Sequence, residues 1–137
     1  MGTLFAALFC SYAPVIDPDL RASMLEVSRM GVMRHDWLET AFRGITSGYL
    51  MATMVWLIPA AGPAHLQIVA LISYVIGIGG FAHVVAGSVA AFMLVIAGQL
   101  GVLPMLGGFL LPALVGNIVG GTVLFALISY AQVMKEI

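Results

Sequence analysis

The stretch Gly79–Ser88, GGFAHVVAGS, lies inside a run from Gly44 to Met134 that contains no Asp, Glu, Lys or Arg. It places two glycines, a histidine and a Gly-Ser pair within an otherwise apolar segment. The surrounding apolar block, residues 66–103, would form a straight helix of about 57 Å at a rise of 1.5 Å per residue. A hydrocarbon core of roughly 30 Å needs only about 20 helical residues. The block is therefore too long for one straight membrane-crossing helix.

Two arrangements of this block fit its length. It forms either two short membrane-crossing helices joined by a tight turn at Gly79-Gly80, or one crossing that is interrupted midway. A hairpin turn is disfavoured because residues 81–85 offer no interfacial polar group. Non-helical backbone is tolerated within a membrane where it faces protein or a cavity. We therefore favour one broken helix, with the break near residues 79–88 and His83 inside it.

The composition indicates an integral membrane protein. Of the 137 residues, 62% are hydrophobic and only 8% are charged, whereas a soluble domain carries about 25% charged residues. A soluble chain this apolar would expose large adhesive patches. The net charge of -1 and the lack of a basic cluster give no indication of nucleic-acid binding. The single cysteine, Cys10, excludes an intramolecular disulfide and is interpreted as a small core residue; no secretory signal is expected.

Residues 17–43 hold nine of the eleven charged side chains. Asp17 followed by Pro18 is typical of a helix N-cap with proline at the first helical position. Gly31 is a suitable residue to end this helix. We therefore expect residues 17–35 to form an amphipathic segment outside the membrane, at its surface. Three apolar residues of this segment fall on one helical face: Leu20, Met24 and Val27.

A second helix start is predicted at Asp36. Asp36 and Glu39 have the spacing of a capping box, in which two side chains bond each other's free backbone N–H groups. A membrane-crossing helix over residues 36–58 is expected to follow. It should run to about Leu57, because Pro59 cannot continue it.

The two tryptophans of this predicted helix mark its ends. Trp37 and Trp56 would be about 29 Å apart at 1.5 Å per residue, which nearly matches the thickness of the hydrocarbon core. Tryptophan favours both membrane interfaces. Arg43 would lie just inside one interface, and we expect its side chain to extend outward to water.

Two further apolar blocks occupy the ends of the sequence. Residues 1–16 are short for a complete crossing. Residues 109–134 are long enough for one helix, with Pro112 in its first turn and Lys135-Glu136 at its end.

These two end blocks share a weak internal similarity. Residues 2–15, GTLFAALFCSYAPV, match residues 120–133, GGTVLFALISYAQV, with five identities at an offset of 118. Transporter folds are often built from repeated units, each with a broken helix. The similarity predicts that residues 1–16 are the tail of a helix that corresponds to the last one. The identical residues in the first block are Gly2, Ser11, Tyr12, Ala13 and Val15.

Three segments resemble the formate/nitrite transporter family. Residues 79–92, GGFAHVVAGSVAAF, resemble the family's fifth helix, which is broken around Gly-Phe-x-His-x-x-Ala. Residues 111–127, LPALVGNIVGGTVLFAL, resemble the sixth helix with its Pro-x-x-x-Gly-Asn-x-x-Gly-Gly motif. Residues 42–56, FRGITSGYLMATMVW, resemble the fourth helix. Familiar members have Glu and Asn at the positions of Ala82 and Gly87, so the chain is nearer a less characterised branch with His-x-x-x-Gly-Ser.

The resemblance implies an all-α integral membrane fold of the aquaporin-like type, with six helices per subunit in an inverted three-plus-three repeat. It implies a homopentamer in the bacterial inner membrane and one pore per subunit for small monovalent anions such as formate, nitrite or hydrosulfide. The chain would supply the second repeat, with its broken helix, and the tail of the preceding helix. It would then be the C-terminal half of a subunit.

His83 is the central candidate of the site. An ionisable residue within a membrane segment is a functional-site hypothesis by default, and the family motif strengthens it over a merely structural histidine. Gly87 and Ser88 would begin the second half-helix, where the positive end of the helix dipole favours an anion. Ser88 is equally suited to capping that half-helix. Gly80 and Gly87 permit close approach of a substrate, or simply tight helix packing.

Asn117 is the second polar candidate. The resemblance places it at the site, where it would hold His83 in one tautomer or line the pore; the alternative is an interhelical hydrogen bond. It lies within a Gly-x-x-x-Gly pattern, residues 116–120, and residues 44–48 have the same pattern, which is typical of helix packing. Three residues match positions near the family's constrictions, with ordinary core packing as the alternative: Ile76, Phe81 and Met51.

The mechanism that follows from these residues is transport of a weak-acid anion. The anion would be drawn to the half-helix start, His83 would help it acquire a proton directly or through its field, and the neutral acid would cross apolar constrictions. An enzyme is not expected, and neither a cofactor nor a metal site is indicated by the scattered Cys and His residues. The alternative is a membrane fragment that does not transport on its own. The arginines of residues 17–43 favour a cytoplasmic location of that segment, whereas the resemblance places it outside.

Overall fold

The structure is a computed structural model that describes residues 1–134, and it is all-helical over this range, with no strand. The predicted end of the last helix at Lys135-Glu136 lies outside the described residues. The five shorter helices are α1 (Gly2–Tyr12), α2 (Pro18–Val32), α3 (Trp37–Leu57), α4 (His65–Ile78) and α5 (Val84–Ile96). One long helix follows over Val102–Gln132. It contains α6 (Val102–Pro104), α7 (Leu111–Ile118) and α8 (Phe125–Val133), joined by π-helical turns over Met105–Leu110 and Val119–Leu124.

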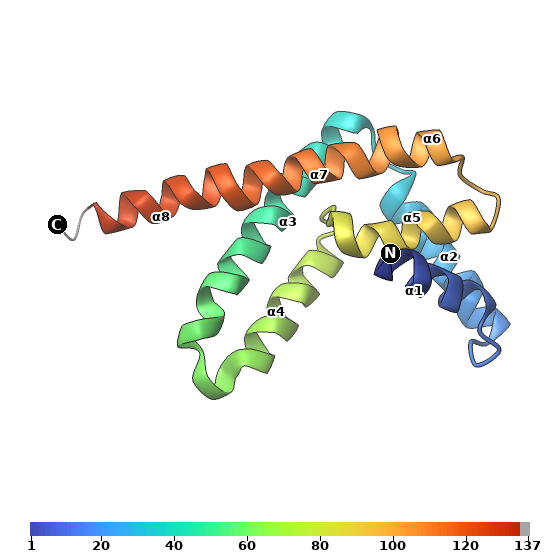
Figure 1. Ribbon diagram of the computed structural model, residues 1–137, viewed down its shortest axis with the longest axis horizontal. Coiled ribbons are helices and arrows are strands. Elements are labelled where there is room, and N and C mark those ends of the chain that lie inside the picture. Colours follow the sequence, from blue (N-terminus) through green and yellow to red (C-terminus); the bar gives the residue numbers. More distant parts are fainter. Residues whose placement is uncertain (135–137) are drawn as a thin grey trace.

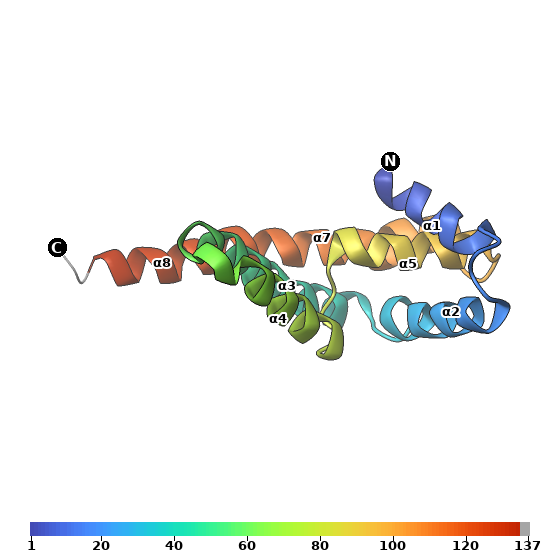
Figure 2. The ribbon, with the colours of Figure 1, turned by 90° about the horizontal axis from the view of Figure 1, so that it is seen from below.

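The long helix α6–α8 runs the length of the molecule, and two groups of helices pack against it (Figure 1). Helices α3 and α4 form an antiparallel hairpin, in which α3 lies along α7 in the most extensive helix contact of the fold. At the other end, α5 lies between α1 and α2, and it contacts both (Figure 2). The short segment between α4 and α5 therefore lies where the two groups meet.

The start of each charged helix follows its predicted cap. The Asp17 carboxylate accepts from the N–H of Asp19 at 2.9 Å, with proline in the first turn of α2. The Asp36 carboxylate accepts from the N–H of Glu39 at 2.7 Å at the start of α3. The expected stop at Gly31 is wrong, because α2 continues to Val32.

The last helix begins at Val102 rather than at Phe109, and residues 102–103 belong to it rather than to the preceding block. Pro112 accordingly lies inside this helix and not in its first turn. Proline cannot donate a backbone hydrogen bond, and its ring crowds the preceding turn. The π-helical turn just before α7 widens the helix at this point, as membrane helices often do around proline. The long helix can therefore pass through Pro112 without ending.

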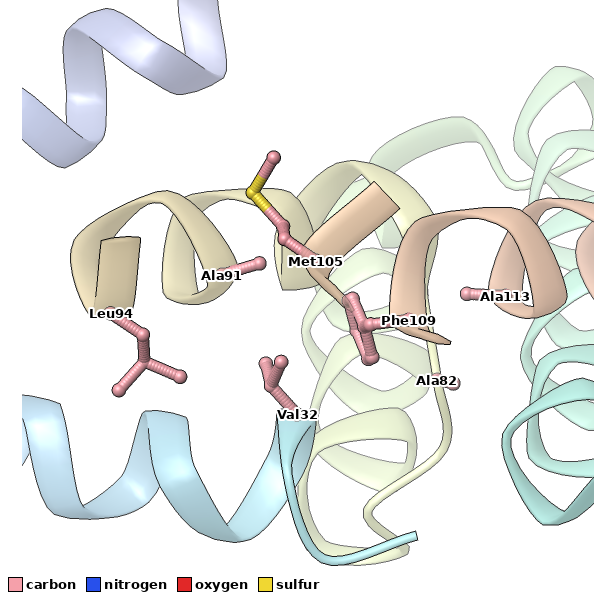
Figure 3. Close-up of a cluster of buried hydrophobic side chains, with 7 residues drawn as sticks. All are labelled: Val32, Ala82, Ala91, Leu94, Met105, Phe109 and Ala113. Carbon is pink, nitrogen blue, oxygen red and sulfur yellow. The ribbon is translucent and has the colours of Figure 1, made fainter. Parts of the chain in front are cut away.

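The apolar core lies between α2, α5 and the start of the long helix (Figure 3). Phe109 is only 3% exposed, and its ring packs against Gly87, where an added Cβ would come within 2.5 Å of the ring. Ala82, in the segment between α4 and α5, belongs to the same cluster. The core therefore reaches the non-helical segment and fixes one side of it. The buried members are Val32, Ala82, Ala91, Leu94, Met105, Phe109 and Ala113.

Much of the remaining apolar surface is exposed. Large side chains at the periphery are almost free of protein contact, such as Phe5 at 72%, Leu66 at 78% and Leu103 at 82% exposure. The long helix has 31 residues, and its most apolar 18-residue window has a mean hydropathy of 2.0, enough in length and composition to cross a membrane. An apolar exterior of this extent suits contact with lipid rather than with water.

Candidate functional site

The site is built around residues 79–83, which separate α4 from α5 and have no helical structure. Gly80 adopts φ of +59°, in the left-handed region that glycine enters at little cost. The N–H of Phe81 still reaches back to the carbonyl of Ile76 at 3.1 Å, which closes the end of α4. The chain then turns through Ala82 and His83 into α5. We call residues 79–83 the break.

Asn117 of α7 holds the C-terminal end of the break, next to α5, which we call its far end. Its Oδ1 accepts from the N–H of Val84 at 3.0 Å, and its Nδ2 donates to the carbonyl of Ala82 at 2.8 Å. One amide side chain thus satisfies a backbone donor and a backbone acceptor on the two sides of His83. The first N–H groups of a helix have no intrahelical partner, so Asn117 supplies one at the start of α5.

Ser47 of α3 completes this arrangement, and we call Asn117 with Ser47 the amide clamp. The Nδ2 group of Asn117 lies 3.0 Å from both Ser47 Oγ and the carbonyl of Gly44. Ser47 Oγ lies 2.6 Å from the carbonyl of Ala82, and its side chain is fully buried. The amide and the hydroxyl together carry three hydrogens. They can satisfy Ser47 Oγ and the carbonyls of Gly44 and Ala82, which joins α3, α7 and the break.

Three glycines bring α3 and α7 close enough for this contact. A Cβ on Gly44 would lie 3.0 Å from the carbonyl oxygen of Ala113, and one on Gly48 would lie 2.7 Å from the Cα of Asn117. A Cβ on Gly116 would lie 2.9 Å from the Cα of Gly44. The packing role predicted for the two Gly-x-x-x-Gly patterns is therefore confirmed for these helices.

His83 itself caps α5. Its Nδ1 accepts from the N–H of Ala86 at 3.2 Å. The expectation that Ser88 caps this helix is wrong: Ser88 lies in the second turn, and its hydroxyl donates to the carbonyl of Val85 at 2.7 Å. Asn117 does not fix the tautomer of His83 by a hydrogen bond, since its bonds go to the backbone on either side. The tautomer follows instead from the cap, which assigns the acceptor role to Nδ1 and leaves the proton on Nε2.

An open cavity of about 920 Å³ lies beside the break, and its wall is mostly apolar. His83, Asn117 and Met51 all line it, so the structure brings together three of the residues that the sequence singled out. The other candidates do not line this cavity: Ser88 lines a smaller one, Gly80 lines a third, and Gly87 packs against Phe109. Ile76 and Phe81 are also absent from its lining.

A second, charged group of side chains holds the N-terminal end of the break, next to α4, which we call its near end. This group is not predicted from the sequence. Arg43 does not simply extend to water, as expected; its Nε donates to the carbonyl of Gly80 at 3.0 Å. Its Nη1 lies 3.1 Å from Glu39 Oε1, which also lies 2.7 Å from His35 Nδ1. We call these three residues the charged clamp. The three residues are spaced four apart, a signal that sequence analysis could have used.

The comparisons with known proteins cover nearly all of the chain. A family model described as "Formate/nitrite transporter" matches residues 1–131. The chain is 39% identical over 136 residues to the inner membrane protein YfdC of Escherichia coli K12. The aligned region covers 99% of this chain and 44% of that relative. The chain thus spans less than half the length of this relative. No solved structure matches it. The chain belongs to the formate/nitrite transporter family, a family of membrane transporters, and it is a protein of the bacterial inner membrane.

Proposed function

We propose that this chain forms one wall of a pathway for small monovalent anions of weak acids, such as formate or nitrite, with His83 at its centre. The observation that carries the proposal is the position of His83, which caps α5 at the break and lines the 920 Å³ cavity. In a mostly apolar wall, a histidine can donate a hydrogen bond or a proton to a passing anion. Helices α4 and α5 would together form one broken crossing, with the break near its middle.

The start of α5 attracts an anion through its field more than through free N–H groups. Two of its first three amides are already bound, the N–H of Val84 to Asn117 and the N–H of Ala86 to His83. The dipole of a helix still places partial positive charge at its N-terminus. The mostly apolar lining of the cavity opposes a bare anion, because loss of hydration in apolar surroundings is costly. An acid that becomes neutral near His83 escapes that cost.

The cap decides how His83 can act. With Nδ1 accepting from Ala86, Nε2 is the ring nitrogen that is free to donate a hydrogen bond to an anion. Complete transfer of the Nε2 proton to the anion requires Nδ1 to take up another proton and to release the N–H of Ala86. Of the two routes open to His83, stabilisation of the anion by a hydrogen bond therefore disturbs the structure less than direct delivery of a proton.

A second candidate function is a fragment that does not transport alone. The cavity is open, and the chain covers 44% of its relative, so a further wall is needed for a closed pathway. In the proposed assembly, an N-terminal half of inverted orientation supplies that wall, this chain forms the second repeat, and five subunits form a pentamer. The similarity of residues 2–15 to residues 120–133 supports such a repeat.

Flux in liposomes tests both functions. We expect formate or nitrite flux when the chain is reconstituted with the N-terminal half of the YfdC relative, and little flux from the chain alone. In the complete assembly, His83→Leu should abolish flux, because it removes the cap and the donor. His83→Asn is the matched variant, since asparagine is a strong N-cap and an amide donor but does not titrate.

His83→Asn should therefore retain flux but lose the part of its pH dependence that comes from protonation of His83. Wild-type, pH-dependent flux in His83→Leu would disprove the role of the histidine. Absence of flux from the complete assembly, with both halves folded and associated, would favour the fragment that does not transport.

A further inference from the structure

A second cavity, of about 740 Å³, lies at the near end of the break and differs in character from the cavity of His83. Polar and apolar atoms contribute about equally to its wall. Of the break residues only Gly80 lines it, together with His35, Glu39 and Arg43 of the charged clamp. The pathway proposed above does not use this cavity, so its charged residues need a separate explanation.

Arg43 is the residue that joins the charged wall to the break. Its side chain is 28% exposed, against 48% for Glu39 and 13% for His35. Nε donates to the carbonyl of Gly80, while Nη1 donates to the Glu39 carboxylate, which His35 also contacts. A guanidinium presents these donors in a fixed fork. The carboxylate therefore fixes the orientation of the fork, and the fork fixes the carbonyl.

The carbonyl that Arg43 holds is one that needs an outside partner. Gly80 has φ of +59°, so its peptide units do not continue the hydrogen-bond pattern of α4. The guanidinium also lies close against Gly80: an added Cβ would be 2.6 Å from Nη2. Any side chain at Gly80 would thus displace the group that holds its carbonyl. A backbone carbonyl bound to a charged donor is held more strongly than one bound to a neutral donor.

We propose that Arg43 is a positioning residue for the break. Its guanidinium, oriented by Glu39 and His35, fixes the carbonyl of Gly80, and this fixes the path of residues 81–83 and the orientation of His83 at the start of α5. The role of Arg43 in transport rests on the proposed function. Its effect on the conformation of the break does not, and it is measured without any substrate.

Hydrogen exchange of the full 137-residue chain in lipid nanodiscs provides that measurement. The probes are the amides of Phe81, Val84 and Ala86, whose bonds close α4, join the amide clamp and cap α5. Arg43→Gln should accelerate their exchange roughly tenfold, the amount expected from a lost hydrogen bond to a charged group. Arg43→Lys keeps the charge but not the fork, so it should rescue only part of the protection.

Two controls separate positioning from general destabilisation. Arg34 lines the same cavity but forms no ion pair or hydrogen bond with the described residues 1–134, so Arg34→Gln should leave the three probes unchanged. Salt of about 1 M screens exposed charges. It should accelerate exchange at the probes in the wild type and have no further effect in Arg43→Gln.

The proposal is overturned if Arg43→Gln leaves the three probes as protected as in the wild type. It is equally overturned if exchange rises by the same factor along α3 and α7, since that indicates loss of the whole fold. A flux measurement on the complete assembly then assigns the consequence: Arg43→Gln should lower flux and Arg34→Gln should not. If even the wild-type assembly carries no flux, the proposed function fails while the exchange result still decides the role of Arg43.

Discussion

The two clamps on the break use opposite chemistry for the same task. The amide clamp, Asn117 with Ser47, is neutral and lies between α3 and α7, with Ser47 fully buried. The charged clamp, centred on Arg43, lies on a partly exposed polar wall. Both bind a carbonyl of the break, that of Ala82 in one case and that of Gly80 in the other.

The degree of burial explains why one clamp is neutral and the other is charged. Transfer of a charged group into apolar surroundings costs far more than transfer of a hydrogen-bonded amide. Asn117 is half-buried beside the fully buried Ser47, and this position suits a neutral side chain that carries both donors and an acceptor, as Asn does. The hydrogen bonds of Arg43 lie closer to the surface, where Glu39 and water share its charge. The far end of the break therefore depends on packing, and the near end depends on electrostatics.

The largest loss of stability is expected when a side chain is added at Gly48, where α3 packs closely against the backbone of Asn117. Gly48→Ala would place a Cβ 2.7 Å from the Cα of Asn117, which belongs to the backbone of α7 and cannot rotate away. Helix separation of this kind costs about 3 kcal/mol. Thermal unfolding in detergent should therefore show a strong loss of stability. Gly107→Ala is the matched control, because a Cβ there meets nothing within 4 Å. Equal losses of stability in both variants would contradict the close packing of Gly48 against Asn117.

Removal of the clamp itself should have the next largest effect. Asn117→Leu keeps the size of the side chain but leaves the N–H of Val84 and the carbonyl of Ala82 without their partner. An unsatisfied buried group costs about 1–3 kcal/mol, and membrane measurements point to the lower end of that range. Unfolding by denaturant should show a loss of about 1–2 kcal/mol.

The control for Asn117 lies one turn along the same helix. Thr122 lines the same cavity, but its hydroxyl donates within the helix to the carbonyl of Ile118. Thr122→Val should therefore change stability much less than Asn117→Leu. A loss in Thr122→Val as large as that in Asn117→Leu would show that the cavity wall, and not the clamp, determines the stability.

Asn117 of the amide clamp is predictable from the sequence, whereas its partner Ser47 and the bond of Arg43 to the break are not, for a physical reason. Asn117 is conspicuous because a polar side chain in an apolar helix needs a partner, and the family motif places it at the site. Arg43 also binds a carbonyl of the break, but the charge of a residue near a helix end is already explained by contact of its side chain with water. Its bond to Gly80 depends on how far α4 returns along α3, which no local pattern determines.

The helix caps and the positions at which helices begin show the same limit of prediction from sequence. Asp17 and Asp36 were identified as caps because the signal lies within three residues. Ser88, a preferred residue type for helix caps, is one candidate for the cap of α5, but the helix begins earlier and is capped by His83. Pro112 is predicted in the first turn of a helix that begins at Phe109, but the helix begins at Val102 and passes through Pro112; the π-helical turn that accommodates the proline has no simple sequence pattern. Local chemistry was thus predictable, whereas positions that depend on packing were not.

The smallest effect on stability is expected in the charged clamp, and salt should remove it. Glu39→Gln leaves Arg43 without its carboxylate, but the pair is partly exposed and spaced as i, i+4. Such pairs contribute about 0.3–0.5 kcal/mol at low salt, and salt near 1 M screens them almost completely. Denaturant unfolding at low salt should therefore show a loss of this size that disappears at high salt. The loss in Asn117→Leu should not depend on salt, since no charge is involved. If Glu39→Gln instead lost the same stability at both salt concentrations, the near end of the break would depend on packing as the far end does, and the division between the two clamps would be wrong.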